Sequence, residues 1–557
     1  MIRITECHSV RAVLLAFLSE FLLGNATRGD ADWDVDSAPG PSKKQAIDCT
    51  EGTWINLDVS PDGTRIVFDL LGDIYTMPIT GADGTKATGK QYPTNLTKTV
   101  AWEMQPRYSP DGKSIAITSD RTGENKKGGD NIWIIGADGS DPMQVTTETF
   151  RLLCNPVWSP DGDYLVARKH FTSRRSLGAG EFWMYHRDAV ASGATAGLQL
   201  TKRPTDQKDV NEQVFSPDGR YLYYSQDVTP GQEFEYDKDS HKGIYAIKRL
   251  DLETGETETL IRGAGGACRP TPSPDGKSLA FVRRVGVKTG LHLFDLESGA
   301  VRSVYEDLER DMQEAWAIHG VYTAFDFTPD GKSIVVWAKG KIRKIDVASG
   351  DSSVIPFRVK DKRTIKPAVR FKIPVGEDEF DVKMLRDVCV SPDGSTVAFN
   401  ALGYVYLKDL SSNHVVRLTD QLSHFEFAPR FSDDGRYIVY TTWNDSTLGS
   451  IRVASVDPNA NENWIVTQTP GHYVEPTFSP DGNHIVYRRV GGGQITSPLW
   501  SRDQGIYVTP TRNGDPKRLA KSGGSPHFTS DWHRVLFTRR ECGKESDNVS
   551  LYSIDLS

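Results

Sequence analysis

Several features that define common protein classes are scarce or missing in this sequence of 557 residues. No run of 18 apolar residues occurs, so no segment is predicted to span a membrane. The net charge is −8 and no long basic run is present, which argues against nucleic acid as a partner because phosphate binding needs clustered lysine and arginine. The six cysteines are too sparse for a disulfide scaffold and show no C-x2-C spacing.

The strong motifs of hydrolytic enzymes are also missing. The twelve histidines form no H-x-H or H-E-x-x-H pattern, which are the arrangements that hold a catalytic metal. No G-x-S-x-G nucleophile turn is present either. The sequence therefore predicts no metal and no cofactor, and it leaves enzymatic activity uncertain.

The N-terminus has the pattern of a secretory signal peptide over residues 1–26. Arg3 and Arg11 precede an apolar stretch over residues 12–24, and Gly24 and Ala26 supply small residues for cleavage. Glu20 within the apolar stretch leaves open a short disordered or interfacial leader instead. Residues 27–43 are rich in Gly, Asp, Ser and Pro and are expected to form a linker. A secreted or periplasmic protein is predicted.

One feature is abundant: a Ser-Pro-Asp-Gly turn or its remnant recurs along the chain. Proline presets φ for a turn, aspartate can accept hydrogen bonds from the backbone, and glycine accepts a positive φ, so each copy predicts a tight hairpin turn. One copy reads Ser-Asp-Asp-Gly and the last reads Thr-Ser-Asp-Trp. The ten copies begin at Ser60, Ser109, Ser159, Ser216, Ser273, Thr328, Ser391, Ser432, Ser479 and Thr529.

Strand-forming segments follow these turns in a regular order. A β-branched and aromatic segment comes first, as in Arg65–Phe68 or Tyr437–Tyr440, and a second comes next, as in Asp73–Tyr75. Four short strands in about 50 residues is the unit of a β-propeller blade, which must stack on its neighbours to bury both faces. The fold is therefore predicted to be all-β, with ten blades of four strands.

Ten blades exceed the usual four to eight of one propeller, so the chain is expected to divide. The longest interval between turns runs for 63 residues, from Thr328 to Ser391. A predicted lead-in strand, Phe371–Val375, precedes the next turn much as Lys44–Asp48 precedes the first. We expect such a strand to complete the last blade of its ring. The prediction is a six-bladed propeller over residues 44–362 and a second, apparently incomplete ring over residues 368–557 with four recognisable blades.

A single large ring of ten blades remains the alternative. If the chain does divide, the basic stretch from Lys360 to Lys366 is predicted to be an exposed connection between the two rings.

These turns resemble the PDG repeats of TolB-like, WD40-like propellers. Three longer segments, over residues 50–75, Arg168–Glu181 and Phe380–Leu385, are similar to the N-terminal propeller region of TolB-like amidohydrolases. The resemblance extends over roughly residues 45 to 555. It implies a secreted or periplasmic location and an association with a metal-dependent hydrolase domain that follows the propellers. The sequence ends before such a domain, so the resemblance carries no catalytic residues onto this chain.

The candidate binding residues lie just before the first strand of several blades, where they would face the mouth of a channel. Polar and aromatic groups that converge there could hold a peptide, a protein segment or a small molecule. The alternative is that they only fill and solvate the channel. They are Trp102, Glu103, Arg151, Arg269, Trp316, His319, His424, His472 and Tyr473.

Arg174 and Arg175 are further candidates, in a distinctive loop over residues 169–181 that could clamp a carboxylate or phosphate. The favoured function is a binding or scaffold protein. The alternative is an enzyme, either a hydrolase component whose catalytic part is separate or an unrecognised activity in the channel.

Overall fold

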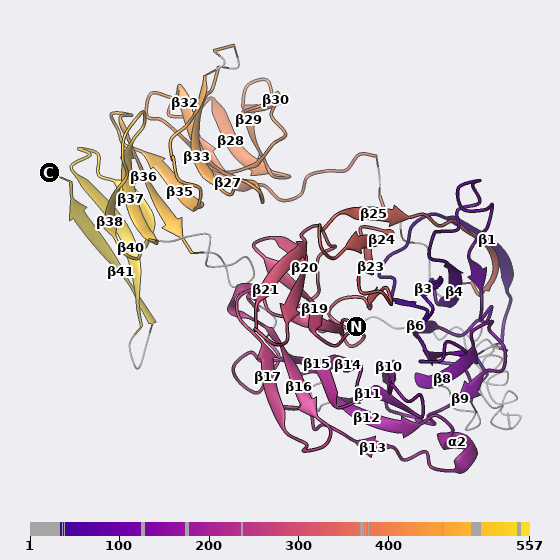
Figure 1. Ribbon diagram of the computed structural model, residues 1–557. Coiled ribbons are helices and arrows are strands. Elements are labelled where there is room, and N and C mark those ends of the chain that lie inside the picture. Colours follow the sequence, from indigo (N-terminus) through magenta and orange to yellow (C-terminus); the bar gives the residue numbers. More distant parts are fainter. Residues whose placement is uncertain are drawn as a thin grey trace, which may run out of the picture.

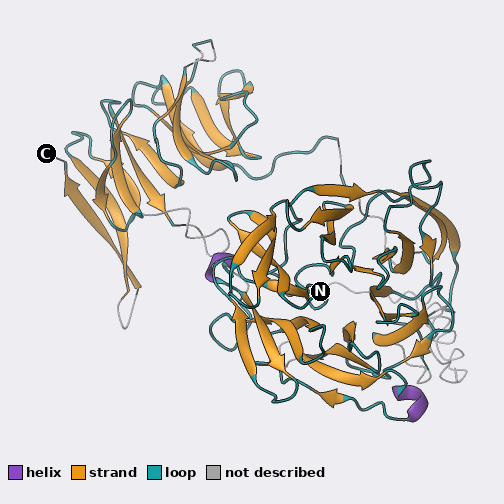
Figure 2. Cartoon of the chain, viewed as in Figure 1, coloured by secondary structure: helices purple, strands orange, loops and turns teal. Residues whose placement is uncertain are grey.

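The computed structural model describes residues 34, 35, 37, 39–123, 129–172, 178–235, 238–367, 373, 375, 376, 378–457, 459, 460, 462–491, 503–542 and 547–556. The predicted signal peptide, together with Arg174 and Arg175, lies outside these residues. Strands make up nearly all the regular structure in the described part, which has only two short helical segments, α2 (Ala189–Ser192) and η1 (Ser240–Lys242) (Figure 2). The all-β prediction is confirmed.

Six successive four-stranded antiparallel sheets, blades 1 to 6, form the first part of the chain (Figure 1). Blade 1 contains β2 (Leu57–Val59), β3 (Arg65–Leu70), β4 (Asp73–Pro78) and β5 (Thr94–Asn95), and blade 2 contains β6 (Glu103–Tyr108), β7 (Ser114–Ser119), β8 (Asn131–Gly136) and β9 (Met143–Gln144). Blade 3 contains β10 (Leu153–Trp158), β11 (Tyr164–Thr172), β12 (Gly178–His186) and β13 (Leu198–Gln199), and blade 4 contains β14 (Val210–Phe215), β15 (Tyr221–Asp227), β16 (Tyr245–Asp251) and β17 (Thr257–Ile261). Blade 5 contains β18 (Cys268–Pro272), β19 (Ser278–Val285), β20 (Lys288–Asp295) and β21 (Val301–Tyr305), and blade 6 contains β22 (Asp326–Phe327), β23 (Ser333–Ala338), β24 (Lys341–Asp346) and β25 (Ser352–Ile355).

Four further sheets, blades 7 to 10, follow in the second part of the chain. Blade 7 contains β27 (Arg386–Val390), β28 (Thr396–Ala401), β29 (Tyr404–Asp409) and β30 (Val415–Arg417), and blade 8 contains β31 (Phe425–Phe431), β32 (Tyr437–Trp443), β33 (Ser450–Ser455) and β34 (Asn463–Ile465). Blade 9 contains β35 (His472–Phe478), β36 (His484–Val490), β37 (Gly505–Pro510) and β38 (Lys517–Ala520), and blade 10 contains β39 (Gly524–Phe528), β40 (Arg534–Cys542) and β41 (Asp547–Asp555). Blade 10 thus has three strands among the described residues.

The repeated turn joins the first two strands of each blade and is built as its residue types predict. In blade 1 the Ser60 hydroxyl donates to Asp62 Oδ1 at 2.6 Å and accepts from the Arg65 N–H at 2.9 Å. Gly63 has φ +70°, a left-handed conformation in which a side chain would be strained. The same serine or threonine to aspartate bond recurs in the other nine turns.

The turns also join one blade to the next. The proline of one turn faces the glycine of the following turn, so that a Cβ placed on Gly112 would lie 3.5 Å from Cδ of Pro61. Pro329 of blade 6 faces Gly63 of blade 1 in the same way, at 3.1 Å, and this contact closes the circle. The intermediate pairs are Pro110–Gly162, Pro160–Gly219, Pro217–Gly276 and Pro274–Gly331. Blades 1 to 6 therefore form a closed ring, and the alternative of one ten-bladed ring is excluded.

A two-stranded clasp fastens the ring where its ends meet. Strand β1 (Lys43–Cys49) pairs antiparallel with β26 (Val359–Ile365), from Lys43 opposite Ile365 to Cys49 opposite Val359. Asp361 on β26 accepts from Tyr75 Oη at 3.0 Å, and Arg363 pairs with Asp73 at 2.6 Å, which ties the clasp to blade 1.

Two expectations about this region are wrong. The strand ahead of blade 1 does not complete the last blade, because β22 to β25 already give blade 6 four strands and β1 pairs with the chain that leaves it. The stretch from Lys360 to Lys366 is exposed to half-buried, but it is not a free connection, since it is paired in β26 as far as Ile365. The boundary proposed at residue 362 falls inside this strand. Most of Phe371–Val375 lies outside the described residues.

Blades 7 to 10 form an arc (Figure 1). The inner strands contact one another in order, β27 with β31, β31 with β35, and β35 with β39. Apolar side chains remain exposed on its two end blades, including Val388 and Val390 of β27 and Leu551 of β41. Within the described residues the arc does not close on itself, which agrees with the predicted incomplete ring.

Candidate functional site at the channel mouth

The innermost strands of eight blades share a bulge at the same place. Pairing between the first two strands slips there, as between Met104 and Arg107 in blade 2. The residue four positions before the serine or threonine of the turn has a positive φ, as in Gln105 at +58°. The bulge turns its N–H out of the ladder, so the N–H needs another acceptor. The other bulge residues are Asn155, Glu212, Arg269, Asp387, Ala428, Glu475 and Ser525.

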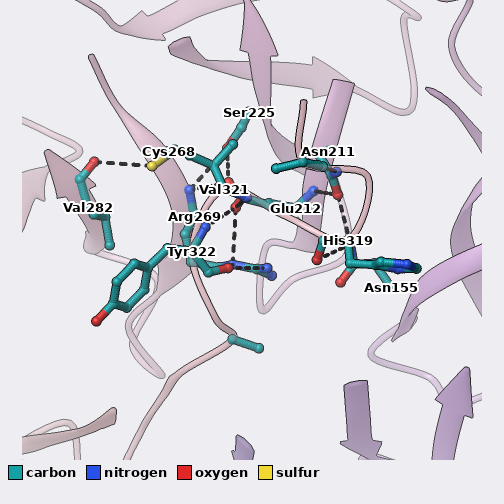
Figure 3. Close-up of polar contacts among 12 residues, drawn as sticks. Asn155, Asn211, Glu212, Ser225, Cys268, Arg269, Val282, His319, Val321 and Tyr322 are labelled. Carbon is teal, nitrogen blue, oxygen red and sulfur yellow. Dashed lines mark hydrogen bonds and ion pairs between the residues drawn. The ribbon is translucent and has the colours of Figure 1, made fainter. Parts of the chain in front are cut away.

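In the ring, side chains satisfy these groups. Three of the four acceptors lie on the preceding blade, whereas the Glu212 N–H donates to Asn211 Oδ1 of its own blade at 2.9 Å. The Gln105 N–H donates to Asp69 Oδ2 of blade 1 at 2.9 Å, and the Asn155 N–H donates to Gln105 Oε1 at 2.8 Å. The Arg269 N–H donates to Glu212 Oε2 at 2.6 Å. A polar network therefore runs from blade to blade around the channel, and part of it is drawn in Figure 3.

A strap of chain, residues 306–325 between β21 and β22, is held in the centre of the ring. Gln105 Nε2 donates to the His319 carbonyl at 2.8 Å, and Asn211 Nδ2 donates to the Ile318 carbonyl at 2.7 Å. Glu212 Oε1 accepts from the Val321 N–H at 2.6 Å. Because blades 2 and 4 both bind the strap, it lies across the channel and forms a floor within it.

A cavity of about 600 Å³ lies between this strap and blades 1 and 2, at the end of the channel opposite the repeated turns. Its lining is mostly apolar and contains three tryptophans, Trp54, Trp102 and Trp316. Trp102 is 54% exposed. The lining also includes Asp69, but no lysine or arginine is among the described residues that form it.

Two residues of this lining are strained. Trp54 has φ +58° and Leu71 has φ +54°, although neither is glycine. The Trp54 ring is fixed edge-on against Tyr322 and Trp337, at 5.9 Å between ring centroids in both cases. Strain of about 1–3 kcal/mol persists only where the surroundings impose it, and such positions cluster at binding sites. The Trp54 side chain is therefore held at the cavity wall before any ligand arrives, whereas the positive φ of Leu71 belongs to the hairpin turn between β3 and β4 and recurs at Lys339 and Leu402.

The structure brings four of the predicted candidate residues together. Trp102, Glu103, Trp316 and His319 all line this cavity. Glu103 is fully buried and forms an ion pair with Arg121, and the Trp316 ring lies 5.7 Å from the His170 ring.

The remaining candidates lie elsewhere. Arg151 stacks over the rings of Phe150 and Phe171 on blade 3. Arg269 is buried and donates to the Tyr322 carbonyl, so it holds the strap in place. His424, His472 and Tyr473 belong to the arc, where Tyr473 is part of the buried core.

The electrostatics of the cavity are set by burial. Burial raises the pKa of Asp69 to about 6, although the N–H groups of Gln105 and Asn56 oppose the shift. Burial also lowers the pKa of His319 to about 4, with a further contribution from Arg168, so His319 is neutral at pH 7. Burial raises the pKa of Glu103, with Arg121 acting in the opposite direction.

The sequence interpretation missed Asp69, Asn56 and the bulge residues other than Arg269. Asn56 donates to Asp69 Oδ2 through Nδ2 at 2.8 Å, and its own Oδ1 accepts from the Ala324 N–H of blade 6 at 3.0 Å. A signal was available, because Asn56 and the bulge residues all lie four positions before the serine or threonine of their turn. No pattern in the repeat distinguishes Asp69, because its role is to accept a hydrogen bond from the Gln105 N–H of the neighbouring blade 2.

The site offers an apolar surface with a few polar groups, among them Asp69, Glu103 and His319. Among the described residues no three His, Cys, Asp or Glu side chains are grouped to hold a metal. Burial raises the pKa of Cys154, the thiol beside Arg168, to about 12, which keeps it protonated.

None of the helices in the described part has the length and apolar character needed to cross a bilayer.

Comparisons with known proteins give relatives of limited identity. No family model matches the chain. It is 27% identical over 205 residues to the uncharacterized peptidase YuxL of Bacillus subtilis, which is 30% of this chain and 29% of that protein. It is 24% identical over 282 residues to the uncharacterized protein Atu1656 of Agrobacterium fabrum, which is 49% of this chain and 80% of that protein. The chain thus matches less than a third of the length of the peptidase.

Solved structures similar to this chain include a protein described as TolB from Agrobacterium tumefaciens, with 19% identity, a TM-score of 0.35 and coverage of 52% of this chain and 96% of that one. The tricorn protease has 13% identity, a TM-score of 0.37 and coverage of 91% of this chain and 49% of that one. The four-stranded antiparallel sheets of the chain itself establish that it is a β-propeller protein.

Proposed function

We propose that this protein is a binding propeller that receives an apolar group of a peptide, protein or small molecule in the cavity at the channel mouth. The observation that carries the proposal is the cavity itself, in which three tryptophans line about 600 Å³ above a fixed floor. Ligand sites are typically concave and apolar, with a few placed polar groups, and volumes of 300–1,000 Å³ are usual.

The site is prepared for binding because its walls are already held in place. The strap is fastened by side chains of blades 2 and 4, including Gln105 and Asn211. Glu212 of blade 4 also accepts from the Val321 and Tyr322 N–H groups. A ligand therefore does not have to order this floor, and avoiding that entropic cost favours affinity.

We propose a secreted or periplasmic location for this binding activity, from the pattern of residues 1–26. The expected mature chain begins near Thr27. N-terminal sequencing of exported protein tests this expectation, and an exported chain that still begins at Met1 would contradict it.

A second candidate function is a substrate-binding part of a hydrolase. It is favoured by the similarity to a protein named as a peptidase, over 30% of this chain. Incubation of the purified chain with dipeptides and cyclic amides, with and without added divalent metal, tests it. Turnover above the uncatalysed rate that falls with the loss of Trp102 would favour this candidate over binding alone.

The binding proposal is tested with a neutral apolar fluorophore, 6-propionyl-2-dimethylaminonaphthalene. We expect saturable binding of one molecule per chain, with an emission shift towards the blue. The variant Trp102→Ala should weaken binding about tenfold, since an aromatic anchor contributes more than about 1 kcal/mol.

The matched control is Trp532→Ala. Trp532 is a partly exposed tryptophan of blade 10, at 38% exposure, far along the chain from the cavity. Its loss should leave the affinity unchanged. Equal weakening by the two variants, or no saturable binding by the wild type, would contradict the proposal.

A further inference from the structure

We infer that the ligand of this cavity carries a positive charge, as an ammonium or guanidinium group attached to an apolar body. This inference rests on the proposed function and specifies the chemistry of the ligand at the same site. It follows from a buried carboxylate without a cationic partner, from the aromatic lining, and from the lack of competing cations in the described lining.

Asp69 is the buried carboxylate. It is 7% exposed, and its hydrogen-bond donors are all neutral. They are the Asn56 N–H at 2.8 Å, Asn56 Nδ2 at 2.8 Å and the Gln105 N–H at 2.9 Å. No lysine, arginine or histidine nitrogen of the described residues lies within 4 Å of its oxygens. A buried charge that is hydrogen-bonded but unpaired is costly, and a cation brought beside it would offset that cost.

The other buried aspartates of the ring differ from Asp69 in this respect. Each has a cationic or titratable nitrogen within ion-pair distance, so the fold normally compensates such groups. The pairs are Asp58 with Arg107, Asp73 with Arg363, Asp209 with Arg168, Asp227 with Lys238, Asp311 with Arg284, and Asp239 with His241. Among these carboxylates, Asp69 lines the cavity and is left for a ligand to neutralise.

The aromatic lining favours the same class of ligand. Trp54, Trp102 and Trp316 come from three separate segments and line one cavity. The face of an indole attracts a cation, and the attraction reaches about 2 kcal/mol where water is excluded. The other carboxylate of the lining, Glu103, is neutralised by its ion pair with Arg121, so Asp69 is the carboxylate of the described lining that has no cationic partner. An anionic ligand would instead meet the unpaired carboxylate of Asp69 and no lysine or arginine of the described lining.

The test compares a cation with its neutral isostere. Choline and 3,3-dimethylbutan-1-ol have nearly the same shape and differ in a quaternary nitrogen that replaces a carbon. Isothermal titration of the full chain at pH 8 should show choline binding at least tenfold more tightly than the alcohol. Equal affinities, or tighter binding of the alcohol, would overturn the inference.

A variant provides a second measurement. Asp69→Asn removes the charge and keeps the size of the side chain, so it should abolish the preference for choline and leave binding of the alcohol nearly unchanged. Thermal melting shows whether the variant folds, and if it does not, the wild-type comparison still decides. Failure of both compounds to bind while the neutral fluorophore binds would overturn the inference and leave the proposed function standing. Failure of the fluorophore as well would overturn the proposed function.

Discussion

The ring and the arc are built from the same repeat, yet only the ring has a complete set of contacts between blades. In the ring, the proline of every turn faces the glycine of the next. In the arc, Pro392 faces Gly435, but Asp433 replaces the next proline, and a Cβ on Gly482 would meet nothing within 4 Å. Gly394, at the start of the arc, has no such neighbour either.

The polar network shows the same difference. In the arc the Ala428 N–H donates to Asp387 Oδ2 at 3.3 Å, and the Ser525 N–H donates to Glu475 Oε2 at 2.8 Å. The corresponding bond from the Glu475 N–H of blade 9 to blade 8 is missing among the described residues, because the methyl group of Ala428 cannot accept a hydrogen bond. Closure of the ring thus depends on a few side chains at fixed positions of the repeat, and the repeat alone does not secure it.

The largest expected effect is a difference in stability between the ring and the arc when each is produced as a separate fragment. A fragment over residues 39–367, which retains both strands of the clasp, should fold alone as a monomer and melt in one sharp transition. A fragment over residues 378–557 should aggregate or melt at lower temperature, because its end blades expose Val388, Val390 and Leu551. Size-exclusion chromatography and calorimetry measure both properties.

A shorter ring fragment over residues 44–362 is the matched control. It lacks Arg363 and so loses the ion pair with Asp73. It should melt below the fragment over residues 39–367. An insoluble ring fragment, together with a single sharp transition of the full chain, would show that the ring does not fold independently.

The next effect concerns the buried ion pair between blades 3 and 4. Arg168 is fully buried and donates to Asp209 Oδ1 at 2.7 Å, so Arg168→Ala leaves an uncompensated carboxylate. Removing one partner of such a pair costs about 3–5 kcal/mol in the free energy of unfolding. The control, Arg436→Ala, removes an exposed pair with Asp434 in the arc and should not change the denaturant midpoint. Similar shifts for the two variants would contradict this account.

A smaller loss is expected in the turn of blade 4. Gly219 has φ +77°, which confirms the left-handed conformation that the repeat predicts. Gly219→Val should destabilise the ring by about 1–3 kcal/mol, since a β-branched residue tolerates this region poorly. Chemical denaturation measures the loss, and an unchanged midpoint would show that the backbone relaxes at no cost.

The smallest effect is a gain in the arc. Asp433→Pro would restore the missing proline of blade 8 opposite Gly482. A proline at a compatible position stabilises by about 0.4–1 kcal/mol, chiefly by restricting the unfolded chain. A rise in the melting temperature of the full chain is expected, and a fall would mean that residue 433 does not have the φ that proline requires.

The sequence predicted the blades, their number and the break between the two sets, because turn chemistry and strand propensity are local properties. It did not predict the clasp, because β1 and β26 are more than 300 residues apart in the chain. The two strands pair with each other because blade 6 already has four strands of its own and needs neither of them. It also missed the strap, whose segment has no periodic pattern and is fixed by Asn211, Glu212 and Gln105 from other blades.

The candidate site was predicted in part for the same reason. Trp102 and Glu103 line the cavity because positions at the start of the inner strand lie at the mouth of any propeller channel, whereas Trp316 and His319 reach it through the strap. Similar positions in the arc, such as Tyr473, are buried in its core instead. Asp69 could not be predicted, because its importance lies in the absence of a cationic partner, which only the packing of neighbouring blades determines.

The affinity of the wild-type chain for choline at two pH values tests the central claim most directly. The lining groups that titrate are Asp69, Glu103 and His319, and only Asp69 has a pKa near 6 without a charged partner. A cation binds the ionised carboxylate, so affinity should be full at pH 8 and fall about tenfold by pH 5, as Asp69 becomes protonated. Equal affinity at both pH values, or no binding at either, would contradict the assignment of this cavity as a cation-binding site.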